Sequence, residues 1–392
     1  PTIIVATRRL SAVQVASAGD VLRVMNWPQD LGKEDIPSFP MLVDSIGFEM
    51  PQRALKPDSW LFEPQSKRGL LERVKAAGIP LGQYVEGRFY RGILTGYNDA
   101  FVINGPTKDR LIFEHPSSAE LIKPYLRGRD IKCWRLEHQD LWLIFTRRGI
   151  EIDSYPAIKR HLSEFREQLE PKPAHWDDDT DGKWKGRKSG SYKWYDIQDN
   201  IAYWAEFEEP KIIVPSISDL PNAARDLSNF HTNNKATIFV TSNQHLPLAV
   251  LNSPIGAWFA RQTFATKAGG FLDFEPRYSQ TFVVPLCSKP LDALVDVTVR
   301  CVEANRDPRL EQLLNGFVYE LFFKEDLHAR NLTLFAEAEK AGLGALSGLE
   351  GPALLHAAAE FADRVFSPTH PLYAMLFDLQ ALDVVRIIEG RE

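Results

Sequence analysis

The sequence feature that most constrains the fold is a change in the spacing of apolar residues near Pro290. Before this proline, short runs rich in β-branched and aromatic residues lie between turn residues and alternate with helical patterns, which is typical of an α+β domain with a mixed sheet. After it, apolar residues recur at helical spacing as far as Ile388. The pattern therefore predicts a mixed-sheet domain followed by an all-helical C-terminal domain.

The same patterns place the individual elements and the domain limits. Strands are expected at 2–7, 99–103, 141–145, 211–215, 237–241 and 281–285, and helices at 66–77, 155–169, 246–264, 291–303, 310–323, 325–341, 352–366 and 372–388. We divide the chain into domains at 1–58, 59–290 and 291–392. The strand at 2–7 has no hairpin partner beside it, so we expect 1–58 to be the end of an upstream domain plus a linker. Pairing with a distant strand of this chain is the alternative.

The net charge of −6 at first argues against a nucleic-acid partner, because domains that bind nucleic acids are often basic. The charge is unevenly distributed, however. Residues 291–392 carry 9 basic and 17 acidic side chains, which leaves residues 1–290 with a net charge of +2. Two clusters of basic and aromatic residues lie in that part, at 123–135 and 183–195. Such clusters are either solvated faces or parts of a surface for a polyanion.

The sequence lacks the motifs of common catalytic and cofactor sites. It contains no phosphate-binding loop, dinucleotide fingerprint, zinc-protease motif or serine-hydrolase motif. The segment that starts at Asp177 imitates an EF-hand loop but has Lys188 where a bidentate Glu is needed. Glu209 and Lys211 have the E-x-K spacing of a nuclease site, which is common by chance. We therefore expect neither a catalytic centre nor a metal site in this chain.

The cysteines and the apolar runs indicate the compartment. The three cysteines lie far apart, which argues against a disulfide framework or a zinc ribbon and suits a reducing, cytoplasmic compartment. No apolar run approaches the roughly 20 residues that span a bilayer, so we expect no membrane partner.

The segment from Gly92 to Ile103 is the richest in potential ligand contacts. Two glycines and an asparagine before a strand-like run indicate a tight turn whose backbone can approach a ligand closely. Thr95, Tyr97 and Asn98 supply hydrogen-bonding groups at its tip. An ordinary hairpin turn is the alternative.

Further motifs follow this segment in order. They lie at 122–134, 194–195, 210–215, 248–253 and 271–278, ahead of 283–285. This succession resembles the target-recognition region (the TaqI-like C-terminal specificity domain) of adenine-specific DNA methyltransferases over roughly residues 60–290. The chain is most similar to the long single-chain type IIG restriction–modification enzymes and to the PglX-like methyltransferases of bacterial phage defence.

The resemblance implies that the chain reads the sequence of double-stranded DNA for an adenine-N6 DNA methyltransferase or restriction–modification enzyme whose catalytic domain is not in this chain. The family's catalytic domain needs a glycine-rich loop for S-adenosylmethionine and an N-P-P-[YF] motif, and this sequence contains neither. We therefore expect no cofactor in this chain, and an upstream domain or subunit that binds S-adenosylmethionine and transfers the methyl group. The strand at 2–7 would be the last strand of that domain. A protein-interaction module of a phage-defence complex is the alternative.

The candidate DNA-binding residues divide by chemistry. Lys and Arg neutralise phosphates, Asn and some Arg read base edges, and aromatic side chains stack on sugars or bases. The candidates are Thr95, Tyr97, Asn98, Lys123, Arg127, Arg129, Lys132, Lys183, Lys185, Arg187, Lys188, Lys193, Tyr195, Asn233, Asn234, Lys235, Lys267 and Arg277. For the asparagines, capping of turns is the alternative, and for Tyr195 it is burial in the core. We expect Trp134 to be a core residue.

Overall fold

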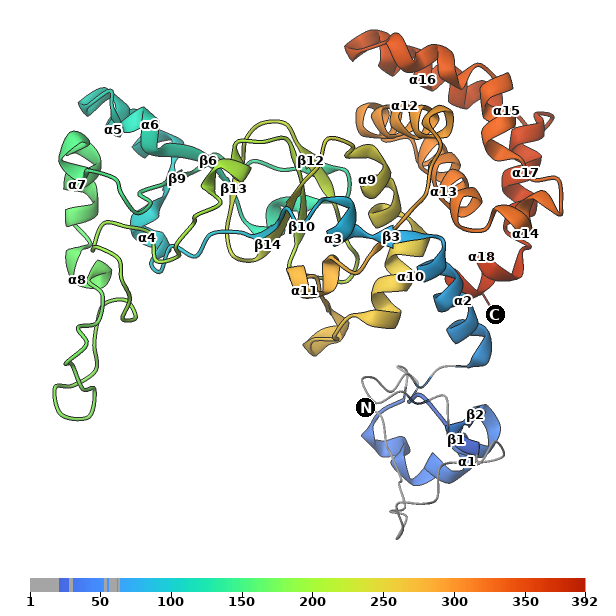
Figure 1. Cartoon of the computed structure of the whole chain (residues 1–392), viewed down its shortest axis with the longest axis horizontal. Coiled ribbons are helices and arrows are strands. Elements are labelled where there is room, and N and C mark those ends of the chain that lie inside the picture. Colours follow the sequence, from blue (N-terminus) through green and yellow to red (C-terminus); the bar gives the residue numbers. More distant parts are fainter. Residues whose placement is uncertain (1–20, 28–30, 53–54, 56–61, 63, 392) are drawn as a thin grey trace. The chain divides into compact units, whose positions relative to one another are not determined.

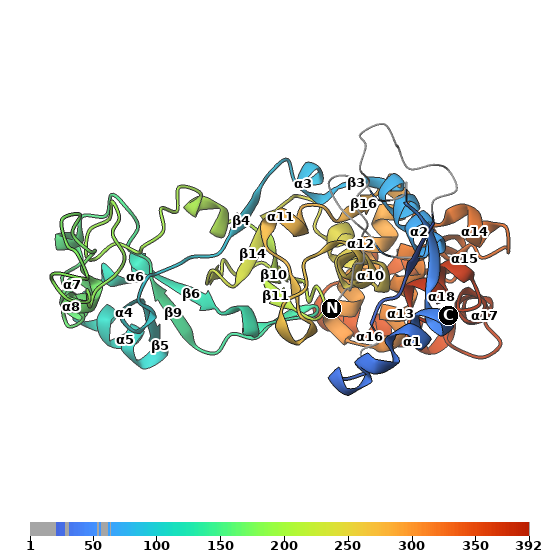
Figure 2. The same cartoon turned by 90° about the horizontal axis from the view of Figure 1, so that it is seen from below.

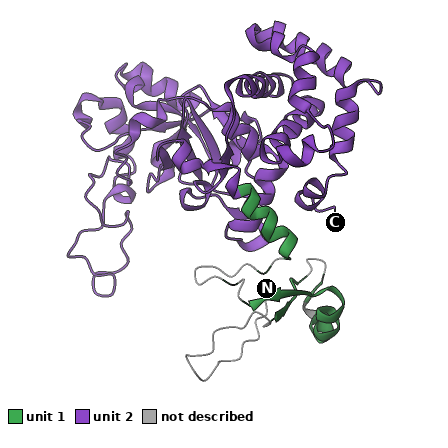
Figure 3. Cartoon of the chain, turned by 45° about the vertical axis from the view of Figure 1, so that its right-hand side comes forward, with its two compact units in different colours: residues 1–74 green, residues 75–392 purple. Residues whose placement is uncertain are grey.

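The computed structural model describes residues 21–27, 31–52, 55, 62 and 64–391. The strand expected at 2–7 lies outside these residues. The chain divides into two compact units, residues 1–74 and 75–392 (Figure 3), and each is described by itself. In unit 1, β1 (Val21–Val24) pairs with β2 (Phe48–Pro51) in an antiparallel sheet, and α1 (Phe39–Ile46) lies between them in sequence. Helix α2 (Gln65–Ala76) confirms the helix predicted at 66–77.

Unit 2 contains two four-stranded sheets (Figures 1 and 2). The first has the order β12 (Ala224–Asp226), β10 (Lys211–Pro215), β14 (Ala236–Val240) and β4 (Phe89–Arg91), and all its pairs are antiparallel. The second has the order β13 (His231–Thr232), β6 (Ile122–Leu126), β9 (Leu141–Ile144) and β5 (Val102–Asn104). Its β13–β6 pair is parallel and its other pairs are antiparallel, so the sheet is mixed as predicted.

The two sheets share one hydrophobic core. Every residue of β10 and β14 is buried, which explains why both strands read as continuous β-branched and aromatic runs. Ile213 and Ile238 of the first sheet belong to the same cluster of buried side chains as Tyr125 and Leu143 of the second. Trp134 is also buried, as expected. The strands predicted at 141–145, 211–215 and 237–241 are therefore confirmed to within one residue.

Several predicted elements differ from the observed ones. The run predicted as a strand at 99–103 begins as helix α4 (Asn98–Phe101), because the β-branched residues start only at Val102. The helix predicted at 246–264 is divided into α9 (His245–Asn252) and α10 (Pro254–Thr263). Ser253 accepts a hydrogen bond from the Gly256 N–H and so begins a new helix, while Pro254 has no N–H with which to continue the previous one.

One further helix is divided by a turn, and one strand is shorter than predicted. The helix predicted at 155–169 forms α7 (Pro156–Ser163) and α8 (Arg166–Leu169). The predicted strand at 281–285 is shorter and becomes β16 (Val283–Pro285), which pairs with β3 (Gly78–Pro80).

The C-terminal part of unit 2 is helical, as predicted, but the helices predicted at 325–341 and 372–388 are each divided in two. Its helices are α12 (Lys289–Asn305), α13 (Pro308–Phe322), α14 (Lys324–His328), α15 (Leu334–Lys340), α16 (Gly351–Val365), α17 (Pro371–Leu379) and α18 (Asp383–Ile388). Helix α12 packs against α9. None of the helices among the described residues is long and apolar enough to cross a membrane.

Acidic side chains of the helical part face the sheet part. Glu303 pairs with Arg225, Glu311 accepts a hydrogen bond from the Trp134 indole at 3.2 Å, and Asp292 lies 2.9 Å from the His245 ring. Some carboxylates of the acidic C-terminal region therefore bind partners inside unit 2.

Candidate functional site

Four segments of the sheet part are joined at one place, which we call the loop edge. They are residues 127–135, 216–220, 233–235 and 266–274. The Gly128 N–H donates to Asn233 Oδ1 at 3.1 Å, and the Ser216 N–H donates to the Lys235 carbonyl at 2.8 Å. The Phe274 N–H donates to the Ser216 carbonyl at 2.8 Å. These hydrogen bonds hold the four segments together, although they are far apart in sequence.

Three of the predicted phosphate-binding cations are exposed on the loop edge. They are Arg129, Lys132 and Lys235, and none of them takes part in an ion pair that the structure shows among the described residues. Gly128 lies directly against Lys235, since a Cβ at position 128 would be 2.5 Å from the Lys235 carbonyl oxygen. The loop edge therefore brings together exposed, positively charged side chains from segments about 100 residues apart in sequence.

Two of the three asparagines predicted to read bases, Asn233 and Asn234, form hydrogen bonds within the protein. Asn233 Oδ1 accepts from the N–H groups of Gly128 and Lys235, so this side chain stabilises the turn, which was the alternative to base reading. The Asn234 N–H donates to the Ile93 carbonyl at 3.0 Å. Both asparagines are half-buried.

The turn at Thr95 to Asn98 is less exposed than the sequence predicted. Thr95 is buried and donates through Oγ1 to Asn98 Oδ1 at 2.7 Å, so the prediction that Thr95 contacts DNA is corrected. Asn98 is exposed, and Tyr97 is half-buried against Phe165. The close backbone approach predicted here does occur at Gly92, but it is made to Asn233, whose carbonyl oxygen would lie 2.0 Å from a Cβ at position 92.

A second group of predicted cations lies on residues 170–200, which we call the arm. This segment is described throughout and contains no regular helix or strand; Figure 1 shows it as a long excursion after α8. Lys183, Lys185, Lys188 and Lys193 are exposed on it. Lys185 pairs with Glu167 at 3.0 Å, and the Lys193 ammonium lies 5.4 Å from the centre of the Tyr195 ring.

Arg187 and Tyr195 of the arm are buried, which corrects their assignment to the DNA surface. The Arg187 guanidinium donates only to backbone carbonyls, those of Leu169, Thr95, Asp196, Lys193 and Trp194, at 2.7–3.3 Å. Burial lowers the pKa of Arg187 to about 10, so the side chain remains charged at neutral pH. An irregular buried backbone exposes carbonyls that need donors, and the five N–H groups of one arginine supply them.

The remaining predicted cations are paired with carboxylates. Lys123 lies 3.0 Å from Glu208, and Arg127 forms a two-point pair with Asp130 at 2.9 Å. Lys267 and Arg277 both contact Asp273, at 3.0 and 3.2 Å. A DNA phosphate would compete with these carboxylates, so these four side chains are weaker candidates than the cations of the loop edge.

Asp273 is a buried carboxylate that organises its surroundings. Burial by itself would raise its pKa, but the Glu275 N–H and the ion pairs with Lys267 and Arg277 outweigh this and lower the pKa of Asp273. The carboxylate thus stays ionised and holds the segments on both sides of β15 (Leu272–Asp273).

Sequence patterns did not reveal the buried polar groups beneath the loop edge. Lys211 and Asp226 form an ion pair of 2.6 Å whose side chains are 0% exposed, and Lys211 also donates to the Phe207 carbonyl. Lys211 is therefore a core residue, and its E-x-K spacing with Glu209 does not form a nuclease site. His231 is fully buried and stacks on Phe207. Lys211 directly precedes an apolar run and His231 lies in a polar stretch, and in neither case does the local pattern reveal burial of a polar side chain.

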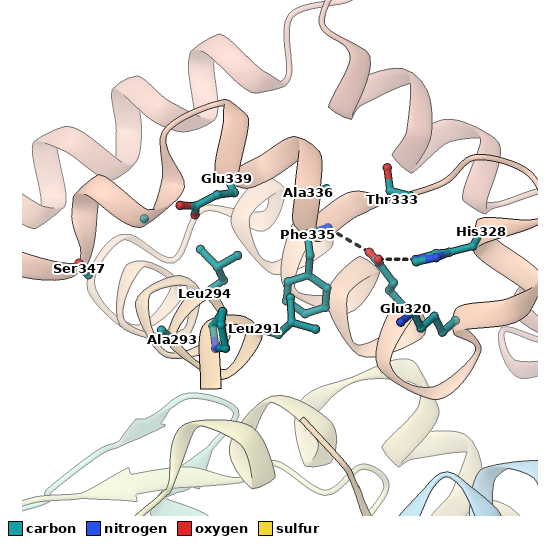
Figure 4. Close-up of a pocket in the computed structure, with 13 residues that line it drawn as sticks. Leu291, Ala293, Leu294, Glu320, His328, Thr333, Phe335, Ala336, Glu339 and Ser347 are labelled. Atoms are coloured by element: carbon teal, nitrogen blue, oxygen red, sulfur yellow. Dashed lines mark hydrogen bonds and ion pairs between the residues drawn. The ribbon is translucent and has the colours of Figure 1, made fainter. Parts of the chain in front are cut away.

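The helical part contains a separate pocket of about 570 Å³ (Figure 4). Leu291, Leu294 and Phe335 contribute apolar surface to it. Glu320 accepts from His328 at 2.9 Å and from the Phe335 N–H at 3.0 Å, so this carboxylate stabilises the start of α15. Among the residues that the structure describes, no group of three or more His, Cys, Asp or Glu side chains is arranged to hold a metal ion.

Comparison with known proteins identifies the segment that contains both basic regions. Residues 123–280 match the family model of the TaqI-like C-terminal specificity domain. Among curated proteins, none matches this chain.

Two solved structures of restriction–modification enzymes also match. The type IIL enzyme MmeI, solved in complex with DNA, is 15% identical with a TM-score of 0.34, over 88% of this chain and 40% of that one. The type IIG restriction endonuclease BpuSI is 15% identical with a TM-score of 0.38, over 82% of this chain and 35% of that one. The chain thus spans less than half the length of either enzyme. Because both TM-scores are low, the functional interpretation rests on the family match.

Proposed function

We propose that this chain, whose residues 123–280 carry a TaqI-like C-terminal specificity domain, recognises a sequence in double-stranded DNA for a restriction–modification enzyme. The observation that carries the proposal is the family match itself, since it includes the whole loop edge and the whole arm. The exposed, unpaired cations of the loop edge supply the electrostatic surface that such a role requires. The match is to a DNA specificity domain, which disfavours the alternative of a protein-interaction module.

The exposed side chains divide the work of recognition. Arg129, Lys132 and Lys235 neutralise phosphates, which provides affinity and register without sequence information. Sequence is read by groups that reach base edges, and Asn98 and Asn234 are the accessible candidates. The acidic helical part is assigned to packing rather than to DNA contact.

The finer features of the parent enzyme are also part of the proposal. We place adenine-N6 methylation, with S-adenosylmethionine as methyl donor, in an upstream domain or subunit of a bacterial, cytoplasmic enzyme that serves in phage defence. This sequence has neither the glycine-rich loop nor the N-P-P-[YF] motif of that activity, so we assign no residue of this chain to the cofactor. Incubation of the chain with duplex DNA and S-adenosylmethionine should give no methyl transfer, and measurable transfer would contradict this division.

A binding experiment tests the recognition role. The purified chain should bind a pool of random duplexes, with affinity falling about 10²-fold between 50 and 200 mM salt, as expected for about four phosphate contacts. Repeated selection from the pool should enrich one sequence. Undetectable binding at low salt, or binding that does not depend on salt, would contradict the proposal.

A further inference from the structure

One loop-edge segment forms a tight turn at residues 266–272, which we call the tip, and an aromatic side chain is exposed there. Thr266 bridges Leu272 in an antiparallel arrangement, and the Lys267 N–H donates to the Phe271 carbonyl at 2.6 Å. Gly269 and Gly270 form the turn with φ of 80° and 79°, a conformation that favours glycine at both positions. Phe271 follows directly and is 45% exposed.

Buried contacts hold this tip in place. The Asp273 N–H donates to the Ala265 carbonyl, and the Asp273 side chain, 1% exposed, binds Lys267 and Arg277 on either side of the strand. Pairing of Ile217 with Asp273 attaches the tip to β11 (Ile217–Ser218). Because the turn is already formed, exposure of Phe271 is not the result of a loose loop end.

The surroundings of Phe271 combine apolar surface with positive charge. Ile217, on the paired strand, is 47% exposed, and Leu220, three residues later in the sequence, is 38% exposed. The same strand is linked through Ser216 to Lys235 and, through Gly128, to the segment of Arg129. Exposed apolar side chains on a fixed turn indicate a surface that is covered by a partner.

The positive charge near Phe271 indicates which kind of partner covers this surface. A protein partner for an apolar tip would not require exposed cations without carboxylate partners, such as Arg129 and Lys235, on the linked segments, whereas duplex DNA offers both phosphates and the apolar faces of its bases. Apolar side chains of DNA-binding proteins enter partly unstacked base steps, while nearby cations hold the backbone.

Building on the proposed function, we propose that Phe271 is a wedge that inserts into a base step of the bound duplex, with Ile217 supporting it and Arg129 and Lys235 holding the flanking phosphates. Insertion opens the step, so the chain favours DNA in which that step is already weakened.

A pair of duplexes that differ by one mismatch tests the wedge. The full chain is titrated with a 20-base-pair duplex and with the same duplex carrying one central mismatch, because a mismatched step costs less to unstack. The wild-type chain should prefer the mismatched duplex by about tenfold. Phe271→Ala should remove the preference and leave the salt dependence unchanged, whereas Phe271→Leu should retain part of it. Phe377→Ala removes another exposed phenyl ring, 72% exposed in the helical part, and should retain the preference.

A second measurement follows the base step itself. With 2-aminopurine beside the mismatch, fluorescence should rise on binding of the wild-type chain and of Phe377→Ala, and remain low with Phe271→Ala. Equal preference and equal fluorescence for wild type and Phe271→Ala would overturn the wedge while leaving DNA recognition intact. Absence of any duplex binding by the wild-type chain would overturn the proposed function, and the wedge with it.

Discussion

The loop edge and the arm have similar proportions of basic and aromatic residues, but they use their cations differently. On the loop edge, Arg129, Lys132 and Lys235 are exposed and have no ion pair within the described part of the chain. In the arm, Arg187 is 4% exposed and is fully engaged with backbone carbonyls. The difference follows from the backbone: the loop-edge segments are linked by their own N–H groups, whereas the irregular arm recruits a side-chain donor for its carbonyls.

The two regions also rest on different buried groups. Beneath the loop edge, His231 lies between Phe207 and Phe145, with ring centres 4.9 Å from each. Burial lowers the pKa of His231 to about 3, so this ring is neutral. The arm rests on Arg187, which stays charged because its pKa remains at about 10. Acid should therefore destabilise the core beneath the loop edge, where His231 must take up a proton, and leave the contacts of Arg187 in the arm unchanged.

The largest effect is expected from Arg187→Ala. The substitution leaves five backbone carbonyls without their donor, so the free energy of unfolding should fall by at least about 3 kcal/mol. Urea denaturation followed by tryptophan fluorescence measures it. Lys188→Ala, at the exposed neighbouring position, is the control and should change stability by less than about 0.5 kcal/mol. Similar values for the two variants would show that Arg187 does not hold the arm.

Removal of the loop-edge cations should weaken DNA binding most. The triple variant Arg129→Ala, Lys132→Ala, Lys235→Ala should lose about 10²-fold in affinity for a duplex and about 2.7 in the slope of log affinity against log salt. The matched arm variant, Lys183→Ala, Lys188→Ala, Lys193→Ala, should lose less, because the acidic residues 177–181 lie in the same segment. A greater loss in the arm variant would reverse the assignment of the two regions.

Acid should destabilise unit 2 through His231. Between pH 3 and 6.5 the unfolded state binds a proton that the folded state excludes, so the stability contributed by the neutral ring is complete above pH 6.5 and is lost as pH falls toward 3. From pH 7 to pH 5 the loss is about 2 kcal/mol. Denaturation of wild type and His231→Phe at both values isolates this contribution, which should disappear in the variant. An equal pH dependence would exclude His231 as its source.

The smallest effect is expected for Asn233. Asn233→Ala removes the acceptor of the Gly128 and Lys235 N–H groups, and stability should fall by about 1 kcal/mol. Asn234→Ala, at the neighbouring position, is the control for stability by thermal melting, and selected-duplex binding is measured for Asn233→Ala and wild type. If Asn233→Ala instead changes the selected DNA sequence without changing the melting temperature, the side chain reads a base rather than stabilising the turn.

Most elements of the fold could be predicted from local pattern. Continuous β-branched runs indicated β10 and β14, and helical spacing indicated α12, α13 and α16. The division of the predicted helix at Ser253 was missed, although the serine and the following proline carry the signal. The arrangement of the strands could not be predicted, because β10 pairs with β14 across about 20 residues and β4 joins them from far earlier in the chain.

The candidate site could be predicted only in part. The basic clusters were visible in sequence, but their exposure was not, so Thr95, Arg187 and Tyr195 were assigned to the DNA surface although they are buried. The exposed Phe271 is the opposite case, since an aromatic residue beside a strand is usually expected to be buried. Burial depends on contacts between distant segments, which residue type alone does not specify.

The sequence by itself determined the change from mixed sheet to helices, the segregation of acidic charge in the last hundred residues and the family resemblance, because each depends on residue types and their order along the chain. Only the tertiary structure shows which cations are exposed to solvent and which donate hydrogen bonds to backbone carbonyls. Whether an arginine binds a phosphate or a carbonyl depends on which donors the surrounding backbone lacks, and that is known only once segments 127–135, 216–220, 233–235 and 266–274 are brought together.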